Sequence, residues 1–477
     1  MAEFTEIINA LAECVGREHL KTEEDVLSLY RVDGLLPKAV AFPHNTDQVS
    51  GLMKIACREG WAVIPWGAGT KIATGNPPQR LDLVISTKRM NHMRDVDVAN
   101  LTLTVEAGVR FRDIQARLAT QEDRCYLPLE DLVTESGEVI CSERSHSGCF
   151  FPLDPPFSEN ATIGGVMAAD SSGPKRLYYN LPRDLVLGAK VVAADGSVVG
   201  TGGKTVKNVS GYDISKLMLG THGSLGVVCE MTLRLLPLPE SMATVVFSFA
   251  DFESASAFAD AVLNTTMLPA AVEVMNAAAF NALEGEDLPG LREDGFAVAA
   301  AFEHFKTAVD RMKEKFSETA KAHGATGERL IGEDHHALFW LKVGDIMPVG
   351  AESDAGYVSI KLNYPIAAWK ETVKTALEGF EKQGFSPRLL VHSGSGVCLV
   401  STDIGSDGGK VSGIVKDLLA SCRRAGGNLV VQYAPTGLKK DLPIWGEAGS
   451  DFVVMKRLKE RLDPKGTMCP GRYVGGL

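Results

Sequence analysis

This sequence of 477 residues has no excess of positive charge, no long apolar run and no even number of cysteines. Its 49 lysines and arginines stand against 60 aspartates and glutamates, so the formal net charge at pH 7 is −11. Nucleic acids and anionic membrane surfaces repel a negative protein, which excludes nucleic acid as a partner. The longest apolar stretches, such as Phe296 to Phe302, are far shorter than the ~18 residues that cross a bilayer, which excludes direct membrane insertion.

The cysteines and the N-terminal residues argue against secretion. The nine cysteines are scattered and odd in number, so they cannot all pair internally. No basic and apolar leader precedes the acidic start at Ala2, Glu3 and Glu6. We therefore expect a cytoplasmic protein with reduced thiols, which reaches a membrane only peripherally and through a partner.

Glycine, by contrast, is abundant. Its 48 residues exceed the average usage of about 7%, and such an excess favours tight turns or close approach of the backbone to a ligand. The remaining composition, 45% hydrophobic and 23% charged, is ordinary for a globular protein. The length corresponds to about two or three domains.

The N-terminal half alternates short strands and helices. Thr46 is the expected N-cap of a helix over residues 47–60, and a strand over 62–65 leads into a glycine turn. Further strands are predicted over residues 101–106, 185–193 and 225–236, and a helix over residues 111–119.

From about Ser241 the pattern changes to longer helices between single strands. The periodicity predicts helices over residues 252–264, 305–323, 366–383, 408–425 and 451–462. Strands are predicted over residues 296–302, 357–363, 388–391, 397–401 and 428–432. This alternation indicates a second α+β domain.

The first candidate ligand-binding segment is the glycine turn Pro65-Trp66-Gly67-Ala68-Gly69-Thr70. Glycines there let successive backbone N–H groups turn toward one anion, such as a pyrophosphate. No Gly-Lys-Ser/Thr follows, and Ile72 stands where a dinucleotide fold has its third glycine. Taken alone, the stretch is more typical of an ordinary tight turn.

Two more glycine-rich stretches follow in the sequence. The second is Glu159-Asn160-Ala161-Thr162-Ile163-Gly164-Gly165-Val166, which leads to Asp170-Ser171-Ser172-Gly173-Pro174. Asn160 or Thr162 can cap a helix whose first turn is rich in glycine. The third runs over residues 203–213 and is followed by Gly220-Thr221-His222-Gly223-Ser224-Leu225-Gly226-Val227-Val228.

Together and in this order, the three stretches resemble the FAD-binding half of the vanillyl-alcohol oxidase superfamily. Within it they are most similar to the flavin subunits of glycolate oxidase and to FAD-linked D-lactate dehydrogenases. The resemblance covers about residues 37–239 and resumes at Leu462-Asp463-Pro464-Lys465-Gly466 and Pro470-Gly471-Arg472.

The resemblance implies an α+β fold in three parts. Residues 1–240 would form a two-lobed FAD-binding domain, with a cysteine-containing insertion over 120–157. Residues 241–442 would form a cap, or substrate domain, with an antiparallel sheet and helices. Residues 443–477 would form a C-terminal helix and tail that return to the FAD-binding domain.

FAD is therefore the expected cofactor. Backbone donors can bind its phosphates without a basic patch, and no histidine lies in or beside the first glycine loop, so we expect noncovalent FAD. For Lys204, Lys207 and Lys216, contact with the cofactor and solvation at the surface both stay open. The resemblance implies FAD contacts from Pro65, Trp66, Gly67, Ala68, Gly69, Thr70, Thr162, Ile163, Gly164, Gly165, Ser171, Ser172, Gly173, Lys207, Gly211, Tyr212, Gly223, Gly226, Val227 and Val228.

The cap departs from the family at its metal-binding motif. Relatives that oxidise D-2-hydroxy acids carry H-x-G-D-G-N-x-H and a later E-H-G, whereas this chain has Val391-His392-Ser393-Gly394-Ser395-Gly396-Val397-Cys398-Leu399 and later Gln432-Tyr433-Ala434-Pro435. His392 alone cannot supply the three or more ligands of such a site, and neighbours such as His335 and His336 point in different directions on a helix. We therefore predict no divalent-metal site of the family type.

The cysteine-containing insertion holds Cys125, Cys141, His146 and Cys149. Three ligands at non-standard spacing indicate a metal site only weakly, and free thiols in a loop that faces a partner are the more common arrangement.

Oxidation of a hydroxy acid needs a cation for the carboxylate and a base for the hydroxyl proton. Lys361, His392 and Arg472 are the candidates, although a structural salt bridge or cap is the more common role for each. Trp340 and Tyr433 are candidates for packing over the flavin ring, although core aromatics are more common.

The departures in the cap point to the E-subunit type of glycolate oxidase, a second flavin-binding paralogue in the same complex. We predict an FAD-binding subunit of a 2-hydroxy-acid dehydrogenase complex, acting on glycolate or D-lactate. Its partners would be the paralogous flavin subunit and an iron–sulfur subunit, because the chain has no Cys-x2-Cys-x2-Cys run of its own. Two alternatives stay open: a self-sufficient, metal-free D-2-hydroxy-acid dehydrogenase, and a catalytically silent FAD scaffold or electron relay.

Overall fold

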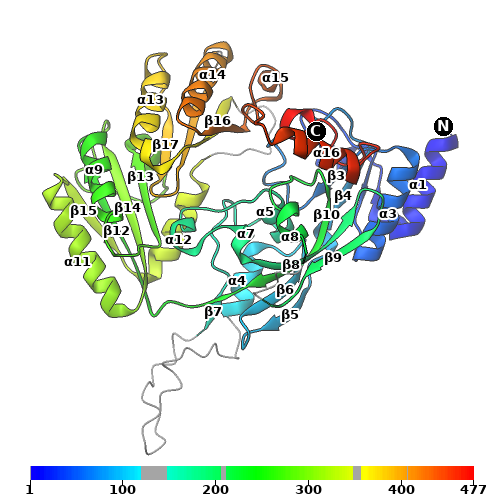
Figure 1. The fold of residues 1–477 in the computed structure, drawn as a ribbon, viewed down its shortest axis with the longest axis horizontal. Helices are drawn as coiled ribbons and strands as arrows, with labels where there is room; N and C mark the ends of the chain where they lie inside the picture. Colours follow the sequence, from blue (N-terminus) through cyan, green and yellow to red (C-terminus); the bar gives the residue numbers. More distant parts are fainter. Residues whose placement is uncertain (1, 120–147, 206–210, 348–355, 406) are drawn as a thin grey trace, which may run out of the picture.

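The computed structural model describes residues 2–119, 148–205, 211–347, 356–405 and 407–477. The chain forms two bodies that lie side by side in Figure 1. The N-terminal domain, which the C-terminal helix and tail rejoin, lies on the right, and the cap lies on the left. Within these residues no helix combines the length and the apolar character needed to cross a membrane.

The first lobe of the N-terminal domain is a four-stranded sheet in the order β1-β2-β4-β3. Both pairs that involve β4 are parallel, so the chain must cross over between β2 and β3, and helix α3 makes this connection. Helix α1 packs on α3 at the outer side of the lobe. The elements are α1 (Ala2–Val15), β1 (Leu20–Lys21), α2 (Glu24–Ser28), β2 (Ala39–Ala41), α3 (Thr46–Glu59), β3 (Val63–Trp66) and β4 (Leu83–Ser86).

Helix α3 follows the sequence prediction except at its first residue. Its apolar face, formed by Val49, Leu52, Met53 and Ala56, is buried, and Gly60 ends it in the left-handed region at φ 67°. The predicted N-cap Thr46 is wrong, because Asn45 takes that position and its Oδ1 accepts the N–H of Gln48 at 2.9 Å. Asparagine and threonine are both good caps, so only the backbone geometry separates two such neighbours.

The second lobe is a five-stranded antiparallel sheet in the order β5-β6-β10-β8-β9. Helices α4 and α5 share a hydrophobic core with β6 and β10. The elements are β5 (Met93–Asp97), β6 (Thr102–Glu106), α4 (Phe111–Ala119), β7 (Cys149–Phe150), α5 (Ile163–Ala168), α6 (Arg176–Tyr179), α7 (Pro182–Leu185), β8 (Val186–Ala193), β9 (Val198–Gly202), α8 (Ile214–Met218), β10 (Gly226–Arg234) and β11 (Leu236–Pro237).

The cap is built on an eight-stranded antiparallel sheet in the order β15-β12-β14-β13-β17-β18-β16-β19. It consists of two β-α-β-β-α-β units, each with its four strands in the order 4-1-3-2, joined through β13 and β17. The strands are β12 (Ser241–Phe249), β13 (Ala271–Asn276), β14 (Phe296–His304), β15 (Gly327–Ile331), β16 (Tyr357–Asn363), β17 (Arg388–His392), β18 (Val397–Asp403) and β19 (Asn428–Tyr433).

Helices cover both faces of this sheet. Four helices pack on one face, and two others pack on the face toward the N-terminal domain. The four are α9 (Phe252–Leu263), α11 (Lys306–Ala322), α13 (Trp369–Glu381) and α14 (Gly408–Arg424), and the two are α10 (Ala277–Phe280) and α12 (Glu333–Asp345). The apolar run in β14 reflects this double cover, because its alternate side chains enter two different cores.

Sequence periodicity did not find β2, β4, β5, β9, β12, β13, β15, α1 or α12, nor several of the shortest elements. Strand β15 carries polar, half-exposed residues, and its only described partner is β12, so its pairing exists only in the assembled sheet. The helix expected over residues 366–383 begins instead with a 3₁₀ turn over Ile366–Ala368 before α13.

The chain returns to the first lobe after α15 (Thr436–Lys439) and α16 (Phe452–Leu462). Met468 bridges to Val63 in parallel, and the N–H of Cys469 donates to the carbonyl of Val63 at 2.9 Å. The C-terminal tail therefore extends the edge of β3, directly beside the first glycine loop.

Candidate functional site

The first two glycine-rich stretches and the segment that follows the third, Gly220 to Val228, meet at one cavity, which we call the glycine cavity. It lies at the end of β3, and α5 and the start of β10 complete its wall. The sequence-predicted residues that line it are Pro65, Trp66, Gly67, Ala68, Gly69, Thr70, Thr162, Gly164, Gly165, Gly223, Gly226, Val227 and Val228.

The glycines of this cavity are required by close approach. A Cβ on Gly67 would lie 2.1 Å from Thr162 Oγ1, and a Cβ on Gly164 would lie 2.7 Å from the Cβ of Ala107. Gly69 has φ +77°, in the left-handed region, and a Cβ there would lie 2.8 Å from the ring of Trp66. A side chain at any of these positions would push the loops apart.

The first loop also presents unused hydrogen-bond donors. Within the described part of the chain, no acceptor is bonded to the backbone N–H groups of residues 67–71. A run of backbone N–H groups without internal partners is the arrangement that binds the oxygens of phosphates. The residues present therefore fit a cofactor with a pyrophosphate.

Several predicted cofactor contacts lie elsewhere. Ile163 is buried in the core of the second lobe, while Gly211 and the 95% exposed Tyr212 line neither this cavity nor the next one described. Lys204 pairs with Asp95, and Lys216 lies 3.5 Å from the carboxylate of Asp213. Lys207 lies outside the described residues.

A second cavity, which we call the charged cavity, lies between the loop that precedes α6 and the sheet of the cap. Its volume is about 150 Å3, against the ~10–15 Å3 that one water requires, so it has room for a small organic molecule. Ser171, Ser172 and Gly173 line it from the N-terminal domain, and Lys361 and His392 line it from the cap. The two cavities share Lys71, Ala169 and His222 as lining residues, so they meet at these residues.

Lys361 projects from β16 into the charged cavity. Its ammonium forms no hydrogen bond or ion pair with the residues that the structure describes. Burial, reinforced by the positive charge of Arg176, lowers its pKa to about 8, against an opposing effect of Asp170. A partly deprotonated lysine in a cavity gains its full charge when an anion binds beside it.

His392 ends β17 and lies directly opposite Glu273 on β13 in the sheet register. Its Nδ1 lies 2.8 Å from Glu273 Oε2, and both side chains are buried. Burial lowers the pKa of His392 well below its usual value and raises that of Glu273 well above its own. The imidazole is therefore neutral at pH 7 and held in one orientation.

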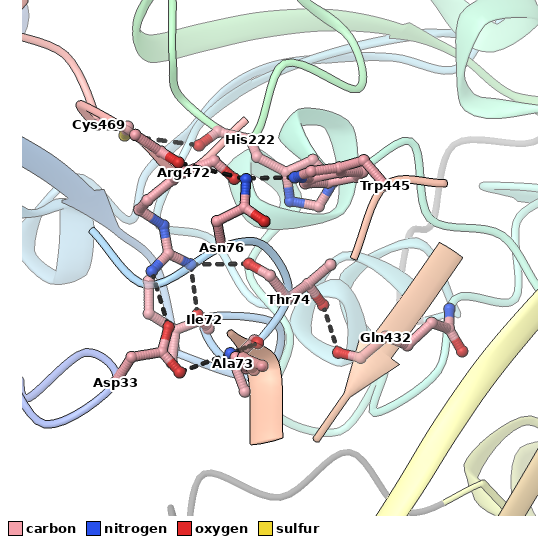
Figure 2. Close-up of polar contacts among 12 residues, drawn as sticks. Asp33, Ile72, Ala73, Thr74, Asn76, His222, Gln432, Trp445, Cys469 and Arg472 are labelled. Carbon is pink, nitrogen blue, oxygen red and sulfur yellow. Dashed lines mark hydrogen bonds and ion pairs between the residues drawn. The ribbon is translucent and has the colours of Figure 1, made fainter. Parts of the chain in front are cut away.

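Arg472 lines the glycine cavity, but its guanidinium is already engaged (Figure 2). It donates to the carbonyls of Ile72 at 2.6 Å and Thr74 at 2.7 Å, and it lies 3.4 Å from Asp33 Oδ2. Lys439 reaches the other oxygen of Asp33 at 2.5 Å. Of its two predicted roles the structural one fits this geometry, because the guanidinium holds the segment that continues the first glycine loop.

Sequence reasoning missed two residues at the junction of the cavities. Lys71 directly follows the first glycine loop, and His222 stands inside the third motif, but no local pattern indicates where either side chain points. The His222 ring packs edge-on against Trp445 with centroids 5.0 Å apart (Figure 2). Burial and neighbouring cations lower the pKa of His222 to about 3, so this imidazole is neutral.

The aromatic candidates belong to the core of the cap. Trp340 donates from Nε1 to Thr244 Oγ1 at 2.7 Å, and Tyr433 stacks on Tyr357 with centroids 4.4 Å apart. Neither lines the glycine cavity or the charged cavity.

Two further predictions concern a metal site and the cysteines of the insertion. In the described ranges no group of three histidine, cysteine or carboxylate side chains is placed to hold a metal, and the lack of a metal site stays a prediction. Cys149 is buried in β7, while Cys125, Cys141 and His146 lie outside the described residues.

Two family models together match most of the chain. One, described as an FAD binding domain, matches residues 37–131 and 136–202, and one described as the C-terminal domain of FAD linked oxidases matches residues 238–473. Glycolate oxidase subunit GlcD of Bacillus subtilis is 25% identical over 451 residues, covering 92% of this chain and 89% of that protein. A D-lactate dehydrogenase of Archaeoglobus fulgidus is 28% identical over 444 residues, covering 92% and 91% of the two chains.

Solved structures share the fold. p-Cresol methylhydroxylase with substrate bound superposes with a TM-score of 0.70 at 16% identity, covering 99% of this chain and 97% of that one. The 4-ethylphenol oxidase from Gulosibacter chungangensis gives a TM-score of 0.71 at 16% identity, with the same coverage of 99% and 97%. The α+β fold class predicted from the sequence is thereby confirmed.

Proposed function

The chain belongs to the FAD-linked oxidases of the vanillyl-alcohol oxidase superfamily, and on this premise we propose that it oxidises a small 2-hydroxy acid, glycolate or D-lactate, as the FAD-binding subunit of a dehydrogenase complex. FAD as the cofactor and membership among FAD-linked oxidoreductases, both predicted from the sequence, are confirmed by the family models and the named relatives. The names of the two relatives support a hydroxy acid as the substrate.

One observation carries the proposal: the glycine cavity meets a cavity that contains both a cation and a neutral imidazole. Bound FAD would supply the hydride acceptor. The glycine loop at residues 67–71 would hold the phosphates through its backbone N–H groups, and the shared lining residues would bring the reacting end of the cofactor next to the substrate.

Within the charged cavity, the roles divide between Lys361 and His392. Lys361 pairs with the carboxylate of the substrate, which supplies the anion that its ammonium lacks. In the tautomer with the proton on Nδ1, His392 donates to Glu273 and leaves Nε2 to accept the hydroxyl proton as the hydride departs. Glu273 holds the ring in this orientation through its contact with Nδ1.

The proposal also specifies the other subunits of the dehydrogenase complex. The loss of the acidic and second histidine positions around His392 supports the E-subunit type, whereas the glycolate oxidase relative named above is subunit GlcD. An iron–sulfur subunit would accept the electrons, because the sequence has no cluster-binding cysteine run. A paralogous flavin subunit would complete the assembly.

The test is anaerobic addition of D-lactate or glycolate to the purified yellow protein, followed through the flavin absorbance. Bleaching by these acids, but not by propionate, which lacks the hydroxyl group, supports a catalyst. Persistent colour with every hydroxy acid, together with stable binding of the partner subunits, contradicts catalysis and supports the silent scaffold. Acid denaturation of the same sample should release intact FAD, and flavin that stays on the polypeptide contradicts noncovalent binding.

A further inference from the structure

A third cavity, which we call the apolar groove, lies between α8, α16 and the C-terminal tail. Leucines of α8 and of the segment after it line one part of the groove, and Met455 and Leu458 of α16 line another. Lys459 also lines it, but its ammonium lies 2.6 Å from the carboxylate of Asp463. The volume of about 110 Å3 admits a side chain of another molecule.

The apolar surface continues beside the groove. On α16, Val453 and Val454 are 52% and 55% exposed, and Leu458 is also exposed. The exposed Tyr212 lies directly before α8. Single exposed apolar side chains are ordinary, but four of them on or beside the two helices of one apolar groove are typical of a surface that binds another molecule.

Aromatic rings link this groove to the two cavities described above. His222 lines both of those cavities, and its ring centroid lies 5.0 Å from that of Trp445 (Figure 2) and 6.3 Å from that of Tyr473. Tyr473 lines the apolar groove, and its hydroxyl donates to the carbonyl of Gly220 at 2.8 Å. Thr221 lines both the glycine cavity and the groove. The groove therefore lies one ring contact away from the place where the glycine cavity and the charged cavity meet.

This position suits the exit of electrons. The rate of electron transfer falls steeply with the distance between donor and acceptor, so an acceptor protein must dock close to the flavin. The reacting end of the cofactor is proposed to lie at the lining residues that the two cavities share, which include His222. A protein docked on the apolar groove would bring its own redox centre to the outer side of Tyr473, which contacts His222 from that side.

The charge around the groove is opposite in sign to that of the whole chain. The segments that line it, residues 213–225 and 451–477, expose the cations Lys216, Lys456, Arg457, Arg461 and Lys465 and the acids Asp213, Asp451 and Glu460. Each of the buried cations Lys459 and Arg472 pairs with an aspartate. The exposed excess of two positive charges contrasts with the net charge of −11. A two-fold dimer of this chain would place the same cations against each other, whereas an acidic partner complements them.

We propose that the apolar groove is the docking surface for the protein that accepts electrons from the flavin, an acidic one-electron carrier that inserts an apolar side chain. The inference rests on the proposed function and locates the iron–sulfur subunit on α8, α16 and the C-terminal tail. In each cycle two oxidised acceptor centres take one electron each from FADH2, which becomes FAD, and its two protons pass to water.

The test uses two acceptors of opposite charge, acidic plant plastocyanin and basic cytochrome c. The FAD of the holoprotein is reduced anaerobically with light and EDTA, so that no hydroxy acid is needed, and its reoxidation is followed through the flavin absorbance. We expect plastocyanin to be about tenfold faster at low salt, and added salt to remove this advantage by screening the exposed charges. The net charge of the chain alone would favour the basic acceptor.

The variant Leu458→Glu places an acidic side chain at the groove. It should slow reoxidation by plastocyanin about tenfold and weaken the binding of plastocyanin to the oxidised holoprotein, which calorimetry measures without electron transfer. The control Leu330→Glu makes the same change at an exposed residue of β15, at the far edge of the cap sheet (Figure 1), and should change neither quantity.

Two outcomes would overturn the docking inference. One is equal reoxidation by the two acceptors, or a rate with plastocyanin that Leu458→Glu leaves unchanged. The other is a dimer of the wild-type protein in sedimentation measurements that Leu458→Glu dissociates, which would assign the groove to a second copy of the chain. None of these measurements uses a hydroxy acid, so a flavin that no hydroxy acid bleaches would contradict the proposed oxidation alone.

Discussion

The glycine cavity and the charged cavity meet, yet they are built in opposite ways. The first is walled largely by backbone and small side chains, and its selectivity comes from N–H groups and from space that only glycine leaves free. The second combines charged and polar side chains, such as Arg176, Lys361 and His392, with apolar ones such as Leu390 and Leu399. The comparison teaches that cofactor binding and substrate chemistry are separable here, so mutations should affect one without the other.

The largest expected effect is on chemistry alone. His392→Ala removes the proposed proton acceptor, so turnover should fall about 10²- to 10⁴-fold, the usual contribution of general base catalysis. Flavin content should stay at the wild-type level, because His392 does not line the glycine cavity. Rapid-mixing measurements of flavin reduction provide the readout.

The variant Glu273→Gln tests, by the same measurement of flavin reduction, how much the partner of His392 contributes. The amide keeps the size of the side chain and a hydrogen-bonding partner for His392 Nδ1, so a smaller loss is expected than for His392→Ala. Equal rates in wild type and both variants would exclude the base role of His392.

The reverse effect is expected at the first glycine loop. In Gly67→Ala the new Cβ would lie 2.1 Å from Thr162 Oγ1, so the loop must move away from α5 and FAD affinity should fall at least tenfold. Titration of the apoprotein with FAD measures this change. Gly203→Ala is the control, because a Cβ there meets no atom within 4 Å. Equal FAD affinity in the two variants would contradict the assignment of the glycine cavity as the FAD-binding site.

The charged cavity should also impose a pH dependence. Binding of the substrate carboxylate requires Lys361 in its ammonium form, and its pKa is about 8. Arg176 and Lys71 lower this pKa and Asp170 raises it, while His392, with a pKa well below its usual value, adds no transition above pH 7. KM should therefore be constant below about pH 8 and rise about tenfold per pH unit above it.

A Lys361→Arg variant provides the control for this profile. Arginine keeps its charge throughout the range, so the rise in KM above pH 8 should disappear or be shallower. An unchanged profile in the variant would assign the transition to another group.

The smallest effect is on stability, and its sign is opposite to that on function. The pKa of Lys361 falls from 10.5 to about 8 on folding, so the unfolded chain binds more protons between these values. The destabilisation is complete below pH 8 and vanishes above pH 10.5. Lys361→Met should raise the free energy of unfolding at pH 7 by at most about 3 kcal/mol.

Urea denaturation of the apoprotein at pH 7 and at pH 10 tests this sign. The gain in Lys361→Met should be smaller at pH 10. A variant that is less stable than wild type at pH 7 would show that Lys361 has a compensating partner in the folded protein.

The two cavities differ in how far local sequence dictates them. A positive φ at Gly69 and the close approach at Gly67 are constraints on single positions, so they leave a motif that can be recognised without a structure. Strand β3, helix α3 and strand β10, which adjoin these loops, were predicted for the same reason, because their periodicity is local. The neighbouring strands β2 and β4 were not predicted, and the choice of N-cap between Asn45 and Thr46 also needed the backbone.

The charged cavity could not be found that way, because tertiary structure alone assembles it. Lys71, Arg176 and His392 belong to three distant segments, and no local pattern records that docking of the cap brings them to one wall. The contacts of Arg472 could not be predicted from local sequence either. Its terminal motif is recognisable, but only the structure shows that Asp33 and two backbone carbonyls engage its guanidinium. Backbone conformation is encoded where it occurs, whereas the charge of a cavity depends on which distant side chains meet there and which of them remain without a partner.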